Sequence, residues 1–445
     1  MRAEGDLGFS PGSRSRGRFF ATGLSAQPSW LAIHNRLRAA GRASPCGATG
    51  SECVVRLSKL PAEAVPAKGL DDDDALAPVA RAVGALPADA APATRAEALL
   101  AALRDARASR FPSATKTALK ALKLRHRVLR VRGSPRDGFW VRALDVISQA
   151  TWAKLAGKDV VAQFTWKVDR YVSRPGNASG WEAFFEPLDE PYGADDTARL
   201  ELDCDLVRRI YPTRAAAYPR TRRDARRVRS LRAAQVAAFV RPNALVRAAA
   251  DAETRRLTGR GQGDAPELLG VHVRGTDKRG KHRAVVPPER YFPLVDAWLA
   301  RPRSSARRRR VFLATDDDDF RERFRANYDT VVVEQRGVAR SRGNASAWFG
   351  GPDAGGFQRG LAVVVDTLLL SRCDFLIKSA SAVSEFALYF RPALESFDFD
   401  VLDDALPSWA PPRTWFADNA TGGPRRPADV KRSKKWRAYH RGGSS

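Results

Sequence analysis

Short apolar runs alternate with segments of helical periodicity along the second half of the chain, and this alternation constrains the fold more than any other feature. The expected strands cover residues 266–273, 309–317, 329–335 and 373–379, and the expected helices cover 287–300, 319–328, 359–372 and 381–390. Strands that alternate with helices at this spacing form a parallel sheet with helices on both faces. The sequence therefore predicts an α/β fold.

The first half repeats the pattern on a smaller scale. A strand at 126–132, a helix at 139–157 and a strand at 158–166 read as one βαβ unit. A long basic helical stretch follows at 218–257, and Pro242 is expected to break it. Two such units predict two Rossmann-like parallel-sheet domains that face a cleft, and we place them at 111–250 and 251–410.

The two ends of the chain have a different composition. Residues 1–110 show no sustained pattern and are expected to form a low-complexity, largely disordered extension, with one helix near 95–108. Residues 411–445 read as a basic tail. An aromatic stretch, GNASGWEAFFEPL at 176–188, is expected to be a loop.

The formal net charge of +26 and the pI near 10.7 favour anionic partners. A composition bias toward Arg, spread over every surface, explains the same charge without any partner. The Arg-rich helix at 222–232 and the tail leave nucleic-acid binding as an alternative. Because the chain has no RRM, KH or zinc pattern, no nucleic-acid partner is expected.

Cysteine spacing, hydropathy and glycosylation signals bear on the compartment. The four cysteines form no CxxC pair and no zinc-ligand spacing, so no structural metal is expected. No run of 18 apolar residues is present, and neither a transmembrane segment nor a signal anchor is visible. Sequons at Asn177, Asn344 and Asn419 suggest a secretory route. The first forty residues read either as a transit peptide or as a truncated start.

A polar cluster, GVHVRGTDK at 270–278, ends the first expected strand of the second half. His272 and Arg274 are two residues apart and so point to one face of the strand. Gly275 allows a tight turn, and Arg274 can hold a phosphate with a fork of donors. Lys278 adds a second cation, and Asp277 can orient Arg274 or bind a sugar hydroxyl. The alternative is an arginine–aspartate pair that only fixes a loop.

Polar residues also follow two other expected strands. Asp316 and Asp317 lie at the end of 309–317, while Lys378 and Ser379 lie at the end of 373–379. Ligands of open α/β sheets bind at the carboxyl ends of the strands. These strand ends together therefore predict a pocket for a nucleotide sugar.

Two helices add further polar residues to this pocket. Ser381 is expected to cap the helix at 381–390, whose free amides would suit a diphosphate. Asp366 lies within an apolar helix and needs a partner, which a ligand hydroxyl or a base edge would supply.

Three motifs resemble those of the α1,6-fucosyltransferase and protein O-fucosyltransferase superfamily, in order and in spacing. They are GVHVRGTDK, then RVFLATDD, then VVDTLLLSRCDFLIKSASAVSEFALYF, and the resemblance covers about residues 125–400. It implies a GT-B-like fold and inverting, metal-independent transfer of fucose from GDP-fucose to a hydroxyl of a glycan or glycoprotein acceptor. It also implies a location in the secretory pathway, in the Golgi or the ER lumen, with no cofactor.

The resemblance implies that Arg274 stabilises the departing β-phosphate. The expected donor-binding residues, taken from the strand ends and from the resemblance, are His272, Gly275, Asp277, Lys278, Asp316, Asp317, Asp366, Lys378, Ser379, Ser381 and Ala382. Asp366 would read the guanine edge or the ribose. Ser381 and Ala382 would hold the diphosphate.

Three departures from the family pattern affect the catalytic prediction. Gly275 stands where the family has a second arginine, Val383 stands where the α1,6 enzymes have Gln, and the acceptor-side glutamate is replaced by His282. His282 is therefore the expected base, with Glu289 or an acid of 316–319 as alternatives. The acid run TDDDD could instead hold a metal ion, and the chain could bind a GDP-sugar or a glycan without turnover.

Overall fold

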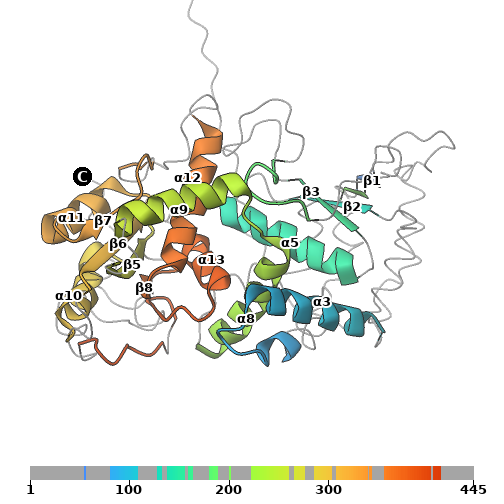
Figure 1. The fold of residues 1–445 in the computed structure, drawn as a ribbon, viewed down its shortest axis with the longest axis horizontal. Helices are drawn as coiled ribbons and strands as arrows, with labels where there is room; N and C mark the ends of the chain where they lie inside the picture. The colour runs from blue at the N-terminus through green and yellow to red at the C-terminus, as the bar shows by residue number, and fades with distance from the viewer. Residues whose placement is uncertain are drawn as a thin grey trace, which may run out of the picture.

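The computed structural model describes residues 55–56, 81–108, 128–132, 138–155, 159–163, 180–188, 200–201, 222–259, 265–275, 285–302, 307–338, 340–342, 355–401 and 404–411. Within these ranges the chain forms two sheets, and every strand pairing in both is parallel (Figure 1). The α/β class with parallel sheets is therefore confirmed.

The two sheets follow one another in sequence. The first has the strand order β1-β4-β2-β3, with β1 at Val55–Arg56, β2 at Val128–Arg132, β3 at Asp159–Gln163 and β4 at Leu200–Glu201. The second has the order β7-β6-β5-β8-β9, with β5 at Glu267–Val273, β6 at Arg309–Thr315, β7 at Val332–Val333, β8 at Phe375–Lys378 and β9 at Ser396–Asp398. Chain order therefore reverses on either side of β5, as in doubly wound folds.

Helices connect and cover these strands. They are α3 at Pro92–Ala108, α5 at Phe139–Leu155, α8 at Arg222–Phe239, α9 at Ala244–Thr258, α10 at Phe292–Ala300, α11 at Asp318–Tyr328, α12 at Gly356–Ser371 and α13 at Ala382–Phe390, with a 3-10 turn, η4, at Pro288–Arg290. The helix expected near 95–108 is confirmed, and it packs against α8.

Local sequence signals explain most of these boundaries. The basic helix breaks at Pro242 as expected, and the Asn243 side chain caps α9 by accepting a hydrogen bond of 3.0 Å from the amide of Val246. The expected helix at 287–300 divides into η4 and α10. Strand β9 was not predicted, because three residues are too few to show a periodic pattern.

The central strand β5 has two different apolar faces. Leu269, Val271 and Val273 belong to a core formed with α10 and α11, where Tyr291 and Trp298 are fully buried. The residues that alternate with them, including Leu268 and His272, face α12 and α13. This period of two places His272 at the helix-covered face of the strand end.

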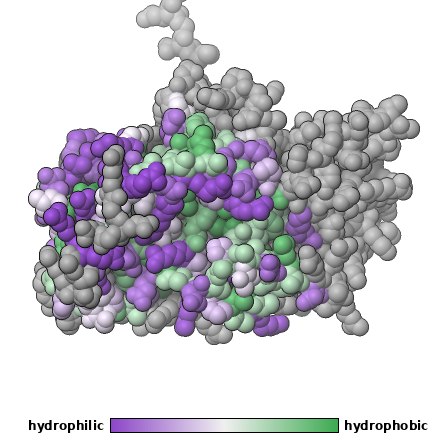
Figure 2. Space-filling model, in the orientation of Figure 1, coloured by the Kyte–Doolittle hydropathy of each residue, from purple (hydrophilic) through white to green (hydrophobic). Residues whose placement is uncertain are grey.

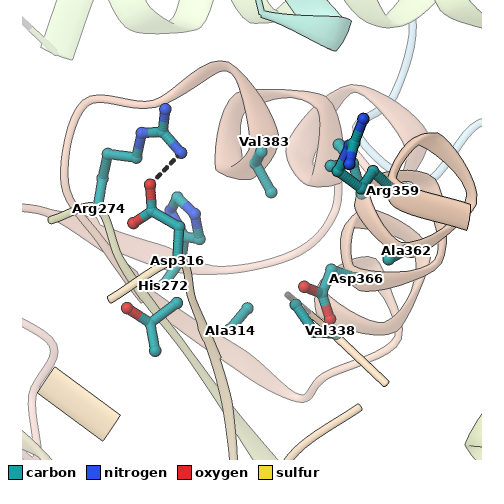
Figure 3. Close-up of a pocket in the computed structure, with 11 residues that line it drawn as sticks. His272, Arg274, Ala314, Asp316, Val338, Arg359, Ala362, Asp366 and Val383 are labelled. Carbon is teal, nitrogen blue, oxygen red and sulfur yellow. Dashed lines mark ion pairs between the residues drawn. The ribbon is translucent and has the colours of Figure 1, made fainter. Parts of the chain in front are cut away.

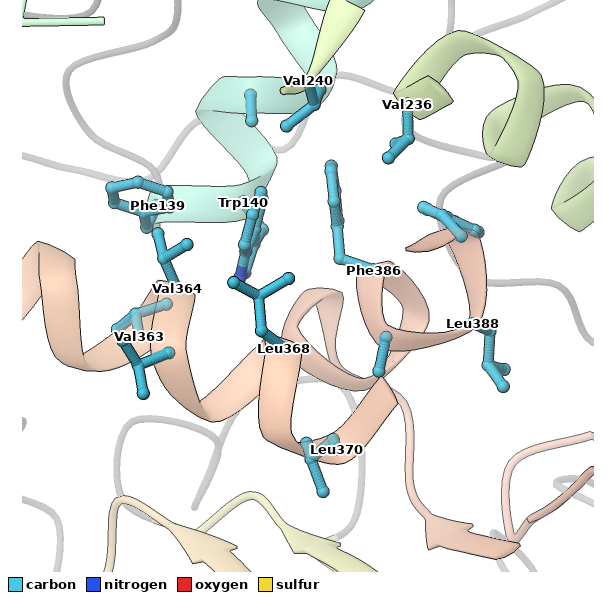
Figure 4. Packing of buried hydrophobic residues seen from close by; sticks show 14 of the residues in the cluster. Phe139, Trp140, Val236, Val240, Val363, Val364, Leu368, Leu370, Phe386 and Leu388 are labelled. Atoms are coloured by element: carbon cyan, nitrogen blue, oxygen red, sulfur yellow. The ribbon is translucent and has the colours of Figure 1, made fainter. Parts of the chain in front are cut away.

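A second core joins the first half of the chain to the second (Figure 4). Trp140 of α5 stacks on Phe386 of α13 at 4.1 Å between ring centroids, and its Nε1 donates a hydrogen bond of 2.7 Å to Thr367 of α12. An aromatic pair of this kind contributes about 0.5–1.5 kcal/mol. The domain division at residue 250 stays a prediction, and that boundary falls inside α9.

The aromatic stretch at 180–188 contributes to this core. Trp181, Phe184 and Phe185 are buried. Phe184 stacks on Phe357, and a Cβ atom at Gly360 would come within 2.4 Å of its ring. The absence of a side chain at Gly360 therefore lets this stretch pack directly on α12.

Hydrophilic residues gather over α11 on the left of the view, and a hydrophobic area lies toward the middle (Figure 2). Among the helices within the described ranges, none has the length and apolar character needed to span a membrane.

The Trp140–Thr367 hydrogen bond gives a test of the joint core. We expect Thr367→Val to lower the free energy of unfolding by about 1–3 kcal/mol, because it leaves a buried indole N–H without an acceptor. In a Trp140→Phe background the same change should cost about 1 kcal/mol less. Urea denaturation of the four proteins measures this coupling. Strictly additive costs would contradict the role given to the bond.

Candidate functional site

A pocket opens where the carboxyl ends of β5 and β6 meet helices α12 and α13 (Figure 3). It has about 540 Å³ of empty space, including the part open to solvent. Its lining residues are His272, Arg274, Ala314, Thr315, Asp316, Val338, Arg359, Ala362, Val363, Asp366 and Val383. Four of the predicted site residues are thus brought together, namely the expected catalytic residue Arg274 and the expected donor-binding residues His272, Asp316 and Asp366.

Asp316 holds the end of β5 in place. One carboxylate oxygen accepts from Arg274 Nη1 at 2.5 Å, and the other accepts from the Gly275 amide at 3.0 Å. The Arg274 side chain is 15% exposed and that of Asp316 is 8% exposed. A guanidinium held by a buried carboxylate has little freedom, so Arg274 is presented to the pocket in one orientation.

His272 is a neutral imidazole in this environment. Burial, together with the nearby charges of Arg274 and Lys378, lowers its pKa to about 3. Its Nδ1 is buried and has no hydrogen-bond partner among the described residues. A buried polar atom without a partner is costly, and a ligand in the pocket would satisfy it.

Asp366 of α12 supplies a second such atom. Its Oδ1 is buried without a partner in the described part of the chain, and Asp366 lines the same pocket as His272. Burial raises the pKa of Asp366 to about 7, although Arg340 partly offsets this effect. Two buried hydrogen-bonding atoms in one pocket point to a ligand with complementary polar groups.

One face of α12 forms a wall of the pocket that sequence reasoning identified only in part. Arg359, Ala362, Val363 and Asp366 are spaced three and four residues apart, so they lie on one helix face. Arg359 is 8% exposed and was not among the predicted site residues. The helical spacing of Arg359 from Asp366 was the signal that could have indicated it.

Asp317 has a structural task next to the pocket. It is fully buried and caps α11, accepting from the amides of Asp319 and Phe320 at 3.0 and 3.4 Å. A Cβ atom at Gly275 would lie 2.3 Å from its Oδ2. The Asp317 side chain thus leaves no space for a side chain at position 275, which accounts for glycine there.

Lys378 lies next to His272 in the sheet but does not line the pocket. Its ammonium is fully buried and donates to Glu385 at 2.7 Å and also to Asp398. Arg229 of α8 binds the same two carboxylates at 2.9 and 3.2 Å. Lys378 was predicted to bind the donor directly, but its side chain serves an internal charge network, because two buried carboxylates need compensation.

The start of α13 differs in detail from the prediction. Ser381 stands at the N-cap, but its side chain makes no capping hydrogen bond. Its backbone carbonyl and that of Ser379 accept from the Ser384 hydroxyl at 3.2 and 3.3 Å. Ala382 follows, and Val383 reaches the pocket. Donor binding by Ser379, Ser381 and Ala382 stays a prediction.

The remaining candidates include residues outside the described ranges and one residue in η4. Asp277, Lys278 and His282 are outside the described residues. Glu289, the alternative base, lies in η4 and pairs with Arg323 at 2.5 Å on the surface. Within the described part of the chain, no three His, Cys, Asp or Glu side chains are arranged to hold a metal ion.

Comparison with protein families gives a match over the segment that builds this pocket. Residues 234–390 match the family described as alpha-(1,6)-fucosyltransferase N- and catalytic domains. The resemblance to the fucosyltransferase superfamily is confirmed over this segment. The match begins within α8, ends with α13 and contains every residue that lines the pocket.

Several solved fucosyltransferases are similar to the chain. NodZ alpha-1,6-fucosyltransferase soaked with GDP-fucose is 18% identical, with a TM-score of 0.36 and coverage of 60% of this chain and 94% of that chain. NodZ from Bradyrhizobium is 19% identical, with a TM-score of 0.34 and coverage of 61% and 94%. A mutant of Arabidopsis thaliana FUT1 in complex with GDP is 12% identical, with a TM-score of 0.36 and coverage of 72% and 80%.

The contact between Gly275 and Asp317 can be tested directly. Gly275→Ala should lower the free energy of unfolding by about 1–3 kcal/mol, because the new Cβ overlaps the Asp317 side chain. The double variant Gly275→Ala/Asp317→Gly should recover most of this loss, since glycine at an N-cap costs only a few tenths of a kcal/mol relative to Asp. Gly84→Ala, where a Cβ meets no atom within 4 Å, is the control. Thermal denaturation compares the proteins, and equal effects at 275 and 84 would contradict the overlap.

Proposed function

We propose that this protein is a glycosyltransferase that transfers fucose from GDP-fucose to a hydroxyl of a glycan or glycoprotein acceptor. The observation that carries the proposal is the pocket in which Arg274, His272 and Asp366 converge at the strand ends. The family match over residues 234–390 supports the same donor. Transfer is proposed to be inverting and independent of metal ions and cofactors, within a GT-B-like arrangement of residues 111–250 and 251–410.

The polarity of the pocket suggests how the donor lies in it. In the view of Figure 3, Arg274 and Arg359 are on either side of Val383, and Asp366 lies below Val383. Arg359 and Asp366 are seven positions apart on the helix, which is about 10 Å along the axis. We place the diphosphate near Val383, between the two arginines, and the guanine edge at Asp366, whose carboxylate would accept from its N–H groups.

Arg274 is the residue to which we assign stabilisation of the leaving group. The acceptor oxygen forms a bond to the anomeric carbon of fucose while the bond from that carbon to the β-phosphate oxygen breaks. GDP departs with the electron pair, and the acceptor proton passes to a base. One preorganised donor at a developing anion contributes about 2.7–4 kcal/mol. His282 stays our candidate for the base.

Asp277, Lys278, Ser379, Ser381 and Ala382 complete the proposed donor site, while Asp316 acts by orienting Arg274. A glycosylation compartment of the secretory pathway is the proposed location. A second candidate function, GDP-sugar binding without turnover, is favoured by one observation: Asp317 leaves no space for a side chain at position 275, so the second arginine of the fucosyltransferase motif is absent there.

Calorimetric titration of the full chain with GDP and GDP-fucose, in the presence of EDTA, tests the donor proposal. We expect the wild type to bind both ligands. Arg274→Ala should lose about 10–100-fold in affinity, because a charge-assisted hydrogen bond contributes about 1.5–3 kcal/mol. Arg247→Ala, which removes an exposed arginine paired with Glu186, is the control.

The outcomes of this titration separate the candidates. Absence of binding by the wild type both with EDTA and with an added divalent cation, or equal binding by Arg274→Ala, would overturn the proposed site. Dependence of binding on a divalent cation would favour the acid run at 316–319 as a metal site. Fucose transfer to a glycan acceptor by the wild type separates an enzyme from a binding protein.

The raised pKa of Asp366 predicts a pH-dependent affinity for guanosine, which carries no phosphate of its own to titrate. The N–H groups of guanine need an ionised carboxylate as their acceptor. The affinity for guanosine should therefore rise with pH up to the pKa of about 7 and level off above it. Since only about one tenth of the carboxyl is ionised one unit below its pKa, affinity at pH 6 should be about tenfold below the plateau. The pKa of His272, lowered to about 3, keeps that group out of this range.

Asp366→Asn serves as the comparison, because an amide does not titrate. Its affinity for guanosine should be low and constant between pH 5.5 and 8.5. A wild-type affinity that does not change with pH, or an Asp366→Asn protein with the same pH profile, would remove Asp366 from the base-binding site.

A further inference from the structure

Four charged side chains form a closed network beneath the first turn of α13. Lys378 donates to Glu385 and Asp398, and Arg229 donates to Glu385 through Nε at 3.0 Å and through Nη2 at 2.9 Å. Arg229 also contacts Asp398 at 3.2 Å. The side chains of Lys378, Glu385 and Asp398 are 0%, 2% and 3% exposed, and that of Arg229 is 19% exposed. Two cations therefore balance two buried carboxylates.

The network members remain charged despite their burial. Burial favours the neutral form of Glu385, yet Lys378 and Arg229 hold its pKa at about 2. Burial likewise opposes the charge on Lys378, but Asp398 and Glu385 raise its pKa above the ordinary value. Removing any one member would leave an uncompensated charge in the interior.

Carboxylates are concentrated around the segment that leads into α13. Glu385 is in the first turn of this helix, and its amide donates to the Ser381 carbonyl at 3.0 Å. Asp400 accepts from the Ala380 amide at 2.6 Å, and Asp398 ends the neighbouring strand β9. An anion bound near the start of α13 would therefore experience these acids as well as the helix dipole.

Arg229 is the network member that does not belong to β8, α13 or β9. It belongs to α8, more than 140 residues before the others, and α8 packs along α13. Its guanidinium spans both carboxylates, which suits a planar fork of donors better than an ammonium. At this position, an arginine of the Arg-rich helix α8 pairs with buried carboxylates inside the protein.

We infer that Arg229 is a positioning residue for donor binding. By neutralising Glu385 and Asp398, together with Lys378, it allows the start of α13 to accept the diphosphate of a nucleotide sugar. The inference rests on the proposed function, because it assumes that the diphosphate lies near Val383. It predicts an electrostatic effect that grows with the charge of the ligand.

Titration of the full chain with guanosine, GMP and GDP tests this dependence on charge. For Arg229→Gln we expect GDP affinity to fall about tenfold or more, GMP affinity to fall less, and guanosine affinity to change by less than about twofold. Arg226→Gln, on the same helix but exposed, should leave all three affinities unchanged. A purely structural loss would lower the three affinities by the same factor.

Restoring the charge balance gives the second arm of the test. The double variant Arg229→Gln/Asp398→Asn again has one cation and one carboxylate, so GDP affinity should return to within about threefold of the wild type. Arg229→Lys keeps the positive charge and should also bind GDP. These two variants decide the matter even where Arg229→Gln alone fails to fold.

The results distinguish the inference from the function on which it rests. Wild-type protein that does not bind GDP would overturn the proposed function. Wild-type binding with unchanged GDP affinity in Arg229→Gln, with an equal loss for all three ligands, or with no recovery in the double variant, would overturn the role of Arg229 and leave the donor site intact.

Discussion

Parallel pairing of β5 between β6 and β8 is the constraint on which the rest of the site depends. It brings the carboxyl ends of three strands to one edge of the sheet, and with them His272, Asp316 and Lys378. Alternation along β5 then directs His272 toward α12 and α13 and leaves Val273 in the opposite core. The chemistry of the pocket is in this sense a consequence of sheet geometry.

Polar side chains near the pocket divide into those that face it and those that hold it together. Asp316 orients Arg274 and Gly275, and Asp317 caps α11. Lys378 stabilises the region beneath α13. Preorganised sites need such supporting residues, because an arginine on an unsupported loop would lose side-chain freedom on binding each ligand. Charged residues of one sequence motif can therefore either face the ligand pocket or support the residues that do.

The first half of the chain contributes more than a separate sheet. Trp140 of α5 enters the core formed by α12 and α13, and Arg229 of α8 completes a charge network at the start of α13. Phe184 packs on α12 where Gly360 has no side chain. These contacts explain why an aromatic loop and a basic helix, far from the motifs in sequence, bear on the geometry of the pocket.

Periodicity and strand-end composition determined the α/β class, the order of most elements and four of the pocket residues, because these follow from local spacing along the chain. Tertiary structure alone decided the role of Lys378, the inclusion of Arg359 and the reason for glycine at 275. Each of these depends on what lies opposite a side chain: Glu385 and Asp398 near Lys378, the pocket beside Arg359, and Asp317 against Gly275. Local sequence patterns carry no information about such contacts, since the partners are brought together only when the chain folds.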